Sequence, residues 1–182
     1  MKISTPLKNA DIKRLNVGAR IFLSGRIFTA RDQAHKRLID IIESAEKRGT
    51  TPRLPFPLKG EVIYYTGPCP KPPGRAIGSC GPTTSTRMDL HTIPLLKMGL
   101  RATIGKGDRS DEVFQALKRY CACYFVASGG CGALIAECVK ECELIAYPEL
   151  GTEAIYRLYV EDMPLVVAGD WLGRSIFKRN KI

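Results

Sequence analysis

A segment rich in glycine and hydroxyl residues, residues 78–89, carries the most chemistry in this sequence. It reads Gly78-Ser79-Cys80-Gly81-Pro82-Thr83-Thr84-Ser85-Thr86-Arg87-Met88-Asp89. Small residues let the backbone approach a ligand closely, and free amides at a helix start attract anions. Arg87 could hold a carboxylate or phosphate through two hydrogen bonds. The segment predicts an anion site, with a plain loop whose threonines cap a helix as the alternative. It lacks the glycine-lysine pattern of nucleotide phosphate loops.

Lys106, Arg31 and His35 are further candidates for the same anion site. Lys106 stands between Gly105 and Gly107 at the end of an expected strand. Its ammonium could point into a cleft, or it could be an ordinary exposed turn lysine. Arg31 stands at an expected helix start, where a cation gains nothing from the helix dipole, so ligand binding would explain it. His35, one turn later, could support Arg31 by a hydrogen bond or could be a surface histidine.

Conventional acid–base and metal-binding constellations do not stand out. The sequence has two histidines and scattered carboxylates, and neither a Ser-His-Asp arrangement nor a metal-ligand spacing is evident. The sequence is rich in cations and hydroxyls but poor in general acids and bases. Such a composition suits half of an active site.

The seven cysteines form no recognisable framework. An odd count in an expected cytoplasmic setting argues against disulfides, and without any Cys-x-x-Cys the zinc-ribbon and common ferredoxin spacings do not fit. Cys121 and Cys123 lie in an apolar run expected to be a strand, so they should face the same side as small buried hydrophobes. The cysteines are Cys69, Cys80, Cys121, Cys123, Cys131, Cys138 and Cys142.

Length and composition indicate one globular domain with a strong positive charge. The chain has 182 residues, of which 45% are hydrophobic, and a net charge of +10. This charge attracts anions of any kind, so nucleic acid, an anionic membrane and a small polyanionic substrate all remain open. The basic residues are spread along the chain, except for a dense group near its end that we interpret as a solvated, frayed tail. This group is Arg174, Lys178, Arg179 and Lys181.

No targeting or membrane segment is evident. Residues 1–15 alternate polar and charged positions without an apolar stretch, which argues against a signal peptide. No run approaches about 18 apolar residues, the length needed to span a membrane. We therefore expect a cytoplasmic protein that does not bind membranes.

The elements that must position these residues follow from hydrophobic periodicity. Residues 20–28 read as a bent strand with Gly25 at the bend, and Ala34, Leu38 and Ile42 recur on one face of a helix that ends near Gly49. Thr29 and Asp32 stand at the spacing of a capping box before this helix. Residues 67–82 form a long irregular loop, which we interpret as functional.

The remaining pattern alternates strands and helices early and clusters strands late. It predicts an α/β fold with a mixed sheet, plausibly in three layers. We expect an N-terminal arm over residues 1–18, one domain over 19–172 and a basic tail over 173–182. Strands are expected at 61–66, 100–104, 124–126, 144–147, 155–160 and 165–168, and helices after residues 83–86, after Ser110 and over about 131–139.

Several motifs in order give the sequence a resemblance to a known family. The chain resembles the β region of the class I iron–sulfur fumarases and tartrate dehydratases from about Gly18 to Asp170. The motifs are Gly25-Arg26-Ile27-Phe28-Thr29-Ala30-Arg31-Asp32 with Ala34-His35-Lys36, Tyr64-Tyr65-Thr66-Gly67-Pro68, Gly81-Pro82-Thr83-Thr84 through Arg87-Met88-Asp89, Ile104-Gly105-Lys106-Gly107, Gly129-Gly130 and Tyr147-Pro148-Glu149-Leu150-Gly151 with Glu153-Ala154-Ile155.

The resemblance implies a swivelling β/β/α domain that closes over a cluster-bearing α region. Because the motifs begin near the start of this chain, we expect the α region to be a separate subunit and the assembly to be a hetero-oligomer. The resemblance places a 4Fe–4S cluster on the cysteines of that partner, so none of the cysteines here should bind iron and this chain should bind no metal.

The resemblance also implies roles for individual residues. Arg31, Arg87 and Lys106 match the family's carboxylate-binding cations, and Thr83 and Thr84 match its paired threonines. Thr83 matches the position to which the family assigns removal of the C3 proton, although a hydroxyl is a poor base without activation; carboxylate binding alone is the alternative. His35, Gly81 and Asp89 are the expected supporting residues.

The expected function is reversible hydration of fumarate to (S)-malate, as the β subunit of a two-subunit hydro-lyase. Conversion of tartrate to oxaloacetate by the same chemistry is the alternative. A remote alternative is a nonenzymatic module that binds anions or nucleic acid. We expect no nucleic-acid binding, because the basic motif residues stand among glycines and hydroxyls without interleaved aromatics.

Overall fold

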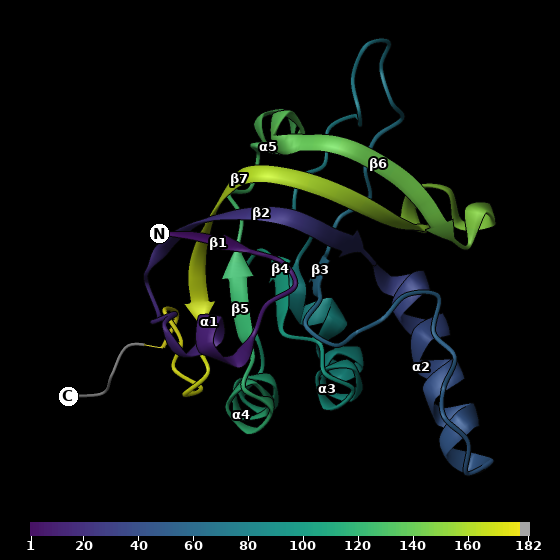
Figure 1. Cartoon of the computed structure of the whole chain (residues 1–182), viewed down its shortest axis with the longest axis vertical. Coiled ribbons are helices and arrows are strands. Elements are labelled where there is room, and N and C mark those ends of the chain that lie inside the picture. The colour runs from purple at the N-terminus through teal and green to yellow at the C-terminus, as the bar shows by residue number, and fades with distance from the viewer. Residues whose placement is uncertain (179–182) are drawn as a thin grey trace.

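The computed structural model describes residues 1–178, which form one mixed sheet with its larger helices on one side and the short helix Gly132–Cys138 on the other (Figure 1). The strand order is β1-β2-β3-β4-β5-β7-β6, and β2 also pairs with β7. Strands β1 to β5 are parallel, whereas β6 and β7 are antiparallel to their neighbours. The sheet is therefore mixed, as predicted. The strands are β1 (Lys2–Ser4), β2 (Arg20–Thr29), β3 (Val62–Tyr64), β4 (Ala102–Gly105), β5 (Cys123–Val126), β6 (Val139–Ala146) and β7 (Ile155–Gly169).

The β2–β7 pairing bends the sheet back on itself. It joins the ends of the series β2-β3-β4-β5-β7 into a ring. In Figure 1 strands β1, β2, β6 and β7 form one layer, and β3, β4 and β5 form a second layer beneath them. The helices are α1 (Asn9–Lys13), α2 (Asp32–Lys47), α3 (Asp89–Lys97), α4 (Asp111–Tyr120) and α5 (Gly132–Cys138), with 3₁₀ helices over Ser85–Met88 and Pro148–Glu153.

Two apolar cores hold three layers together. Along β3, Val62 and Tyr64 face the core between the two strand layers, whereas Ile63 and Tyr65 face the core beneath α2, α3 and α4. This alternation follows from the two-residue period of a strand. Both faces of β3 are buried, which explains its continuous apolar sequence.

The bend predicted in β2 is confirmed. Gly25 has φ 103°, and the register against β7 shifts between Leu23 and Gly25. Only glycine adopts this backbone conformation without strain. The bulge lets one strand pair with β7 along its whole length while its other edge passes from β1 to β3.

The N-terminal segment is not the irregular arm that the sequence suggested. Residues 1–18 contain β1, which pairs with β2, and the short helix α1. Leu7, Ile12 and Leu15 are buried in the core between the strand layers. The polar residues between them conceal this burial in the sequence, and a three-residue strand shows no period.

Three further predictions need correction. Thr29 does not cap α2, because it lies in β2, where its hydroxyl accepts the Tyr156 N–H at 2.9 Å. Residues 155–169 form one long strand and not two. Cys121 is not in a strand with Cys123; it ends α4 with φ 52° and is half-buried.

The described part of the C-terminal tail is attached to the sheet. The Ile176 N–H donates to the Ala168 carbonyl at 3.0 Å, and Arg174 pairs with the buried Asp170. Lys178 forms an ion pair with Asp111. The tail is exposed as predicted, but the predicted fraying is wrong as far as residue 178. Arg179 and Lys181 lie outside the described residues. Within residues 1–178 no helix is both long enough and apolar enough to cross a membrane.

Candidate functional site

The predicted site residues lie where parallel strands end. Strands β2, β3 and β4 run in the same direction, so their carboxyl ends meet at one edge of the sheet. Arg31 follows β2 and Lys106 follows β4, while the long loop from residue 67 follows β3. Ligands of open α/β sheets commonly bind outside the carboxyl ends of the strands. The fold therefore brings to one edge residues that are far apart in the sequence.

The threonine segment is attached to this edge by backbone hydrogen bonds. The Thr83 N–H donates to the Tyr65 carbonyl at 2.7 Å, and the Lys106 N–H donates to the Thr83 carbonyl at 3.1 Å. The Ser85 N–H donates to the Lys106 carbonyl at 2.9 Å, so Thr84 and Lys106 form a parallel bridge. Thr84 and Lys106 are exposed and Thr83 is half-buried. This bridge places the paired threonines directly beside the lysine.

Arg31 and Arg87 belong to one ionic cluster at the start of α2. Asp32 pairs with Arg87 at 2.6 Å and lies 3.8 Å from Arg31. Glu153 lies 3.4 Å from the same Nη2 atom of Arg31 that faces Asp32. The structure thus brings the two arginines together through Asp32, which the sequence suggested only as a capping residue. Glu153 stood in a family motif and gave no other signal.

His35 lies beneath Arg31 and is fully buried. Its Nδ1 is 2.9 Å from the Arg31 carbonyl, so Nδ1 carries the proton and donates it. Burial lowers the pKa of His35 from 6.5 to about 4, and His91 and Arg109 add to the effect. The ring is therefore neutral near pH 7. Its Nε2 has no hydrogen-bond partner among the described residues. His35 thus contacts the backbone of Arg31, and its supporting role at the site stays a prediction.

Gly81 and Asp89 have structural contacts. The Gly81 carbonyl accepts the Thr66 hydroxyl at 2.8 Å, and a side chain at Gly81 would meet the Gly132 backbone at 3.6 Å. Asp89 accepts the Nε–H of Arg109 at 2.5 Å instead of facing the ionic cluster of Arg31 and Arg87. It is the first residue of α3 and binds a buried side chain of the protein interior.

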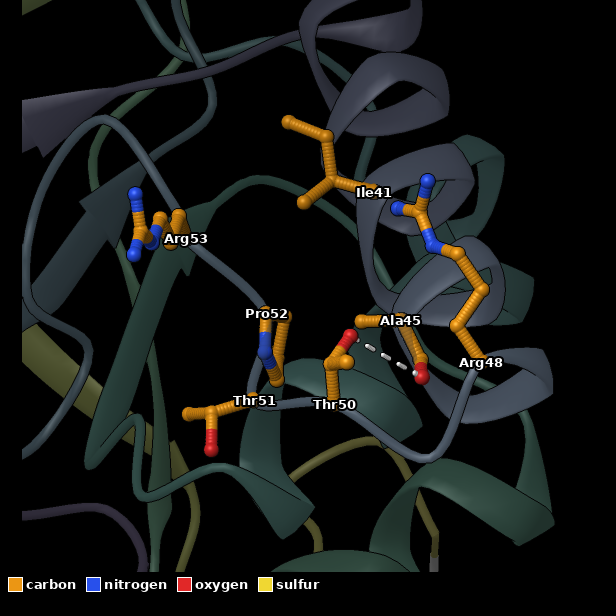
Figure 2. Close-up of a pocket in the computed structure, with 7 residues that line it drawn as sticks. All are labelled: Ile41, Ala45, Arg48, Thr50, Thr51, Pro52 and Arg53. Carbon is orange, nitrogen blue, oxygen red and sulfur yellow. Dashed lines mark hydrogen bonds between the residues drawn. The ribbon is translucent and has the colours of Figure 1, made fainter.

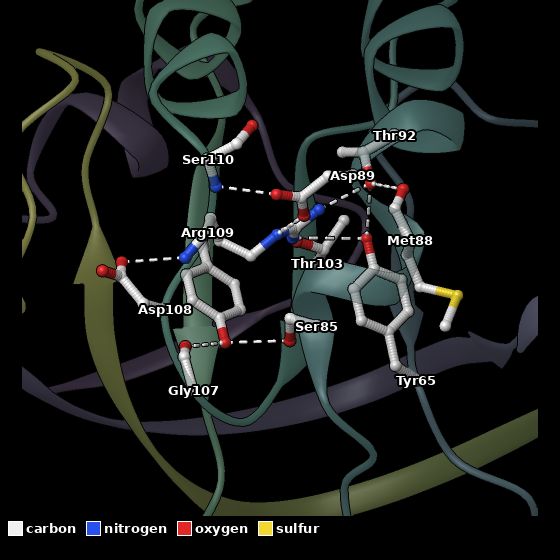
Figure 3. A network of polar contacts seen from close by, with 11 residues as sticks. Tyr65, Ser85, Met88, Asp89, Thr92, Thr103, Gly107, Asp108, Arg109 and Ser110 are labelled. Atoms are coloured by element: carbon white, nitrogen blue, oxygen red, sulfur yellow. Dashed lines mark hydrogen bonds and ion pairs between the residues drawn. The ribbon is translucent and has the colours of Figure 1, made fainter.

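Arg109 is a residue that the sequence reasoning missed. Its side chain is completely buried beneath the site (Figure 3). Burial alone disfavours the charged guanidinium, but the neighbouring Tyr65 and Asp89 outweigh it and raise the pKa of Arg109 above its ordinary value. The sequence gives no signal for this burial, because Arg109 stands in a polar turn where an exposed arginine would be ordinary.

A second group of cations lies in a surface hollow at the other end of α2 and is not part of this site. The hollow has a volume of about 580 Å³ and includes Arg48, Arg53 and Thr50. In Figure 2 the two guanidinium groups lie on opposite sides of the hollow and do not converge. The C-terminal end of a helix also carries a partial negative charge, which disfavours anions. The 16-residue α2 separates this hollow from Arg31 by roughly 24 Å.

The cysteines do not converge on a metal site in the described part of the chain. Cys80 and Cys123 are buried, and burial raises the pKa of the Cys80 thiol to about 12, so it is protonated. Within residues 1–178 no three His, Cys, Asp or Glu side chains are arranged to hold a metal ion.

The arrangement is suited to binding a molecule with more than one negative charge. Arg31, Arg87 and Lys106 present cations at one edge, and Thr83 and Thr84 add hydroxyls beside Lys106. Within residues 1–178 the Lys106 ammonium takes part in no ion pair, so its charge is available to a ligand. Guanidinium groups bind carboxylates with defined geometry, and an ammonium adds charge without directional demand.

Comparison with known proteins identifies the family of this chain. The family model described as "Fumarase C-terminus" matches residues 1–180. The chain is 38% identical to the "Putative L(+)-tartrate dehydratase subunit beta" of Methanocaldococcus jannaschii, over 94% of this chain and 88% of that protein. It is 31% identical to the L(+)-tartrate dehydratase subunit beta of Escherichia coli, over 98% of this chain and 87% of that protein.

A second group of relatives is longer. The chain is 36% identical to the anaerobic class I fumarate hydratase of Escherichia coli over 97% of this chain, but it spans only 32% of that protein. The chain thus covers 87–88% of the two β subunits but about a third of the fumarate hydratase.

Proposed function

The chain belongs to the fumarase C-terminus family, and from this premise we propose that it is the β subunit of an iron–sulfur hydro-lyase acting on a C4 dicarboxylate. The observation that carries the proposal is the meeting of Arg31, Arg87 and Lys106 with two threonines at one edge of the sheet. Relatives in this family are named as fumarate hydratases and tartrate dehydratase subunits.

We favour hydration of fumarate to (S)-malate as the reaction, with conversion of tartrate to oxaloacetate as the alternative. Both substrates are C4 dicarboxylates, so the cations described here suit both equally. The relatives that are named as β subunits support a two-subunit assembly, but these names do not discriminate between substrates. The pocket surface that a partner contributes would decide that point.

This chain would supply the anionic-substrate half of the active site. Arg31 and Arg87 would bind one carboxylate, and Lys106 with Thr84 would bind the other. Binding both ends fixes the orientation of the C3 proton, and the cations stabilise the negative charge that develops when the proton leaves. Thr83 Oγ1 would receive this proton as the alkoxide, after its own hydrogen has passed to solvent water before the site closes. A hydroxyl needs activation for that step, which the adjacent Lys106 charge and exclusion of water would favour.

The 4Fe–4S cluster, which would act as the Lewis acid for the substrate hydroxyl, is assigned in this proposal to a partner α subunit. The exposed edge with Thr84, Arg87 and Lys106 would close against that partner by a swivelling movement of this domain, in the cytoplasm. Closure would exclude water and strengthen the charge interactions.

The test is dehydration of malate by the chain co-expressed with its cluster-bearing partner under anaerobic conditions. Fumarate formation would be followed by its ultraviolet absorbance, with tartrate assayed in parallel and each subunit assayed alone. Activity on malate only in the mixture would support the proposal, and activity only on tartrate would favour the alternative. Inactivity of a cluster-loaded complex on both substrates would overturn the hydro-lyase assignment. Retention on DNA with a steep salt dependence would then favour the nonenzymatic module.

A further inference from the structure

The buried guanidinium of Arg109 forms hydrogen bonds with residues of α3, of β4 and of the segment after β3. Its three nitrogen atoms are all hydrogen-bonded, and its side chain has no exposed surface (Figure 3). The bonds are Nε to Asp89 Oδ1 at 2.5 Å, Nη2 to Thr92 Oγ1 at 2.7 Å, and Nη1 to Thr103 Oγ1 at 3.2 Å and Tyr65 OH at 3.4 Å. A guanidinium with this many fixed partners has one orientation.

The Asp89–Arg109 pair joins the two segments that carry the proposed ligand cations. Asp89 is two residues beyond Arg87 and begins α3. Arg109 is three residues beyond Lys106, and the second oxygen of Asp89 accepts the Ser110 N–H at 2.7 Å, at the cap of α4. The starts of α3 and α4 are therefore bound to each other through one carboxylate.

The Tyr124 hydroxyl makes a second connection between the same two segments. It lies 2.9 Å from Ser85 Oγ and 2.7 Å from the Gly107 carbonyl. A carbonyl can only accept, so Tyr124 donates to Gly107 and accepts the hydrogen of Ser85. Ser85 is two residues before Arg87, and Gly107 follows Lys106. The backbone bridge between Thr84 and Lys106 joins the same two segments.

Buried ion pairs rarely increase stability over an apolar replacement of the same volume, because both charges lose their hydration. Their geometric specificity is a different contribution, since a misplaced partner leaves a buried charge unpaired. Here the buried pair lies between the segment that carries Arg87 and the segment that carries Lys106. It therefore fixes the relative position of these two exposed cations.

We propose that Asp89, Arg109 and Tyr124 form a positioning clamp that fixes the spacing between Arg87 and Lys106, and so sets the affinity for a substrate with two carboxylates. The inference rests on the proposed function, because it takes these two cations as the ligands. None of the three clamp residues needs to contact substrate.

The first test measures the clamp without turnover. Amide hydrogen exchange would be compared in the isolated full chain for the wild type, Tyr124→Phe and Arg109→Lys. The Lys106 and Ser85 amides, which form the bridge, should exchange about tenfold faster or more in both variants, while amides in the β2–β7 ladder keep their rates. Arg174→Lys is the matched control, because Arg174 Nε also donates to a buried aspartate, Asp170, at 2.7 Å.

Unchanged bridge exchange, or equal acceleration across the whole sheet, would overturn the clamp. Tyr124→Phe removes a single oxygen atom, so it keeps the test decisive if Arg109→Lys does not fold. In the complex with the partner, Tyr124→Phe should raise KM for the dicarboxylate by about tenfold while kcat changes less. An unchanged KM would also count against the clamp.

Arg87→Ala in the same complex separates the two proposals. Full turnover by that variant would overturn Arg87 as a substrate ligand, and with it the premise of the clamp, while the hydro-lyase activity itself would stand. Loss of turnover in Arg87→Ala together with normal exchange and KM in Tyr124→Phe would overturn the clamp alone.

Discussion

Arg87 binds Asp32 through two parallel hydrogen bonds, from Nε to Oδ1 at 3.0 Å and from Nη2 to Oδ2 at 2.6 Å. This fork geometry leaves Nη1 as the guanidinium nitrogen available to a ligand. The same carboxylate lies 3.8 Å from Arg31. Asp32 therefore orients one proposed ligand arginine and holds it near the other, across 55 residues of sequence.

Asp32→Ala should lower kcat/KM of the assembled enzyme by about tenfold, because the bidentate bond that orients Arg87 is lost. The pair is partly exposed, so we expect the fold to remain intact and thermal unfolding to change little. Steady-state kinetics and a thermal scan check this. Glu46→Gln is the matched control, since Glu46 also joins α2 to a basic residue, Lys97, at a distance of 3.0 Å. An increase in affinity in Asp32→Ala would show that Asp32 competes with the substrate instead.

Arg87→Ala and Lys106→Ala should each reduce turnover of the assembled enzyme by about 100-fold or more, because charge stabilisation in the transition state is lost. Both side chains are exposed in this chain, so their removal should leave folding unaffected. Circular dichroism of the isolated chain would verify this. Lys36→Ala removes one positive charge from an exposed position of α2 and should keep normal turnover. Near-normal activity in either site variant would contradict the site assignment.

Several parts of the fold could be predicted because their signals are local. The spacing of Ala34, Leu38 and Ile42 predicts α2, and these residues are indeed its buried face. Gly25 predicts the bend in β2, and the motif after β4 places Lys106 at the edge of the sheet. Each of these predictions depends on residues within one element.

Contacts between elements could not be predicted in the same way. Arg109 reads as an ordinary turn residue, and its burial depends on Tyr65, 44 residues away. The capping box proposed for Thr29 and Asp32 had the right spacing, but Thr29 pairs with Tyr156 in the sheet and Asp32 with Arg87. Both side chains form hydrogen bonds with residues that are distant in sequence instead of the local hydrogen bonds of a capping box.

His35 should make the stability of the isolated chain depend on pH. Its pKa is about 4 in the folded protein and 6.5 in the unfolded chain, so the unfolded state binds more protons between these values. Stability therefore falls as pH decreases from 6.5 to 4, by up to about 3 kcal/mol from this residue. Denaturant unfolding at several pH values measures the slope.

His35→Asn is the variant that isolates this effect, because an amide can still donate to the Arg31 carbonyl but does not titrate. It should flatten the dependence between pH 6.5 and 4. His91→Gln removes the neighbouring ring, which stacks on His35 at 6.1 Å, and should keep most of the slope. A slope in His35→Asn equal to the wild-type slope would show that other groups cause the acid sensitivity.

Gly105→Ala should disturb the site from within the sheet. A Cβ at this position would overlap the Ser85 hydroxyl and approach Tyr65 to 3.0 Å. Ser85 is buried and bonded to Tyr124, so it cannot move without breaking that contact. We expect a loss of about 1–3 kcal/mol in the free energy of unfolding, which is typical of overpacking.

Gly129→Ala is the control for this substitution, because a Cβ there meets only the Lys106 side chain at an ordinary 3.7 Å. It lies at the same edge and should keep wild-type stability within about 0.5 kcal/mol. Adding Ser85→Ala to Gly105→Ala should recover part of the lost stability, because it removes the overlapped oxygen. If the denaturant midpoint of Gly105→Ala equals that of the wild type, the packing of Ser85 against β4 does not constrain the residue at position 105.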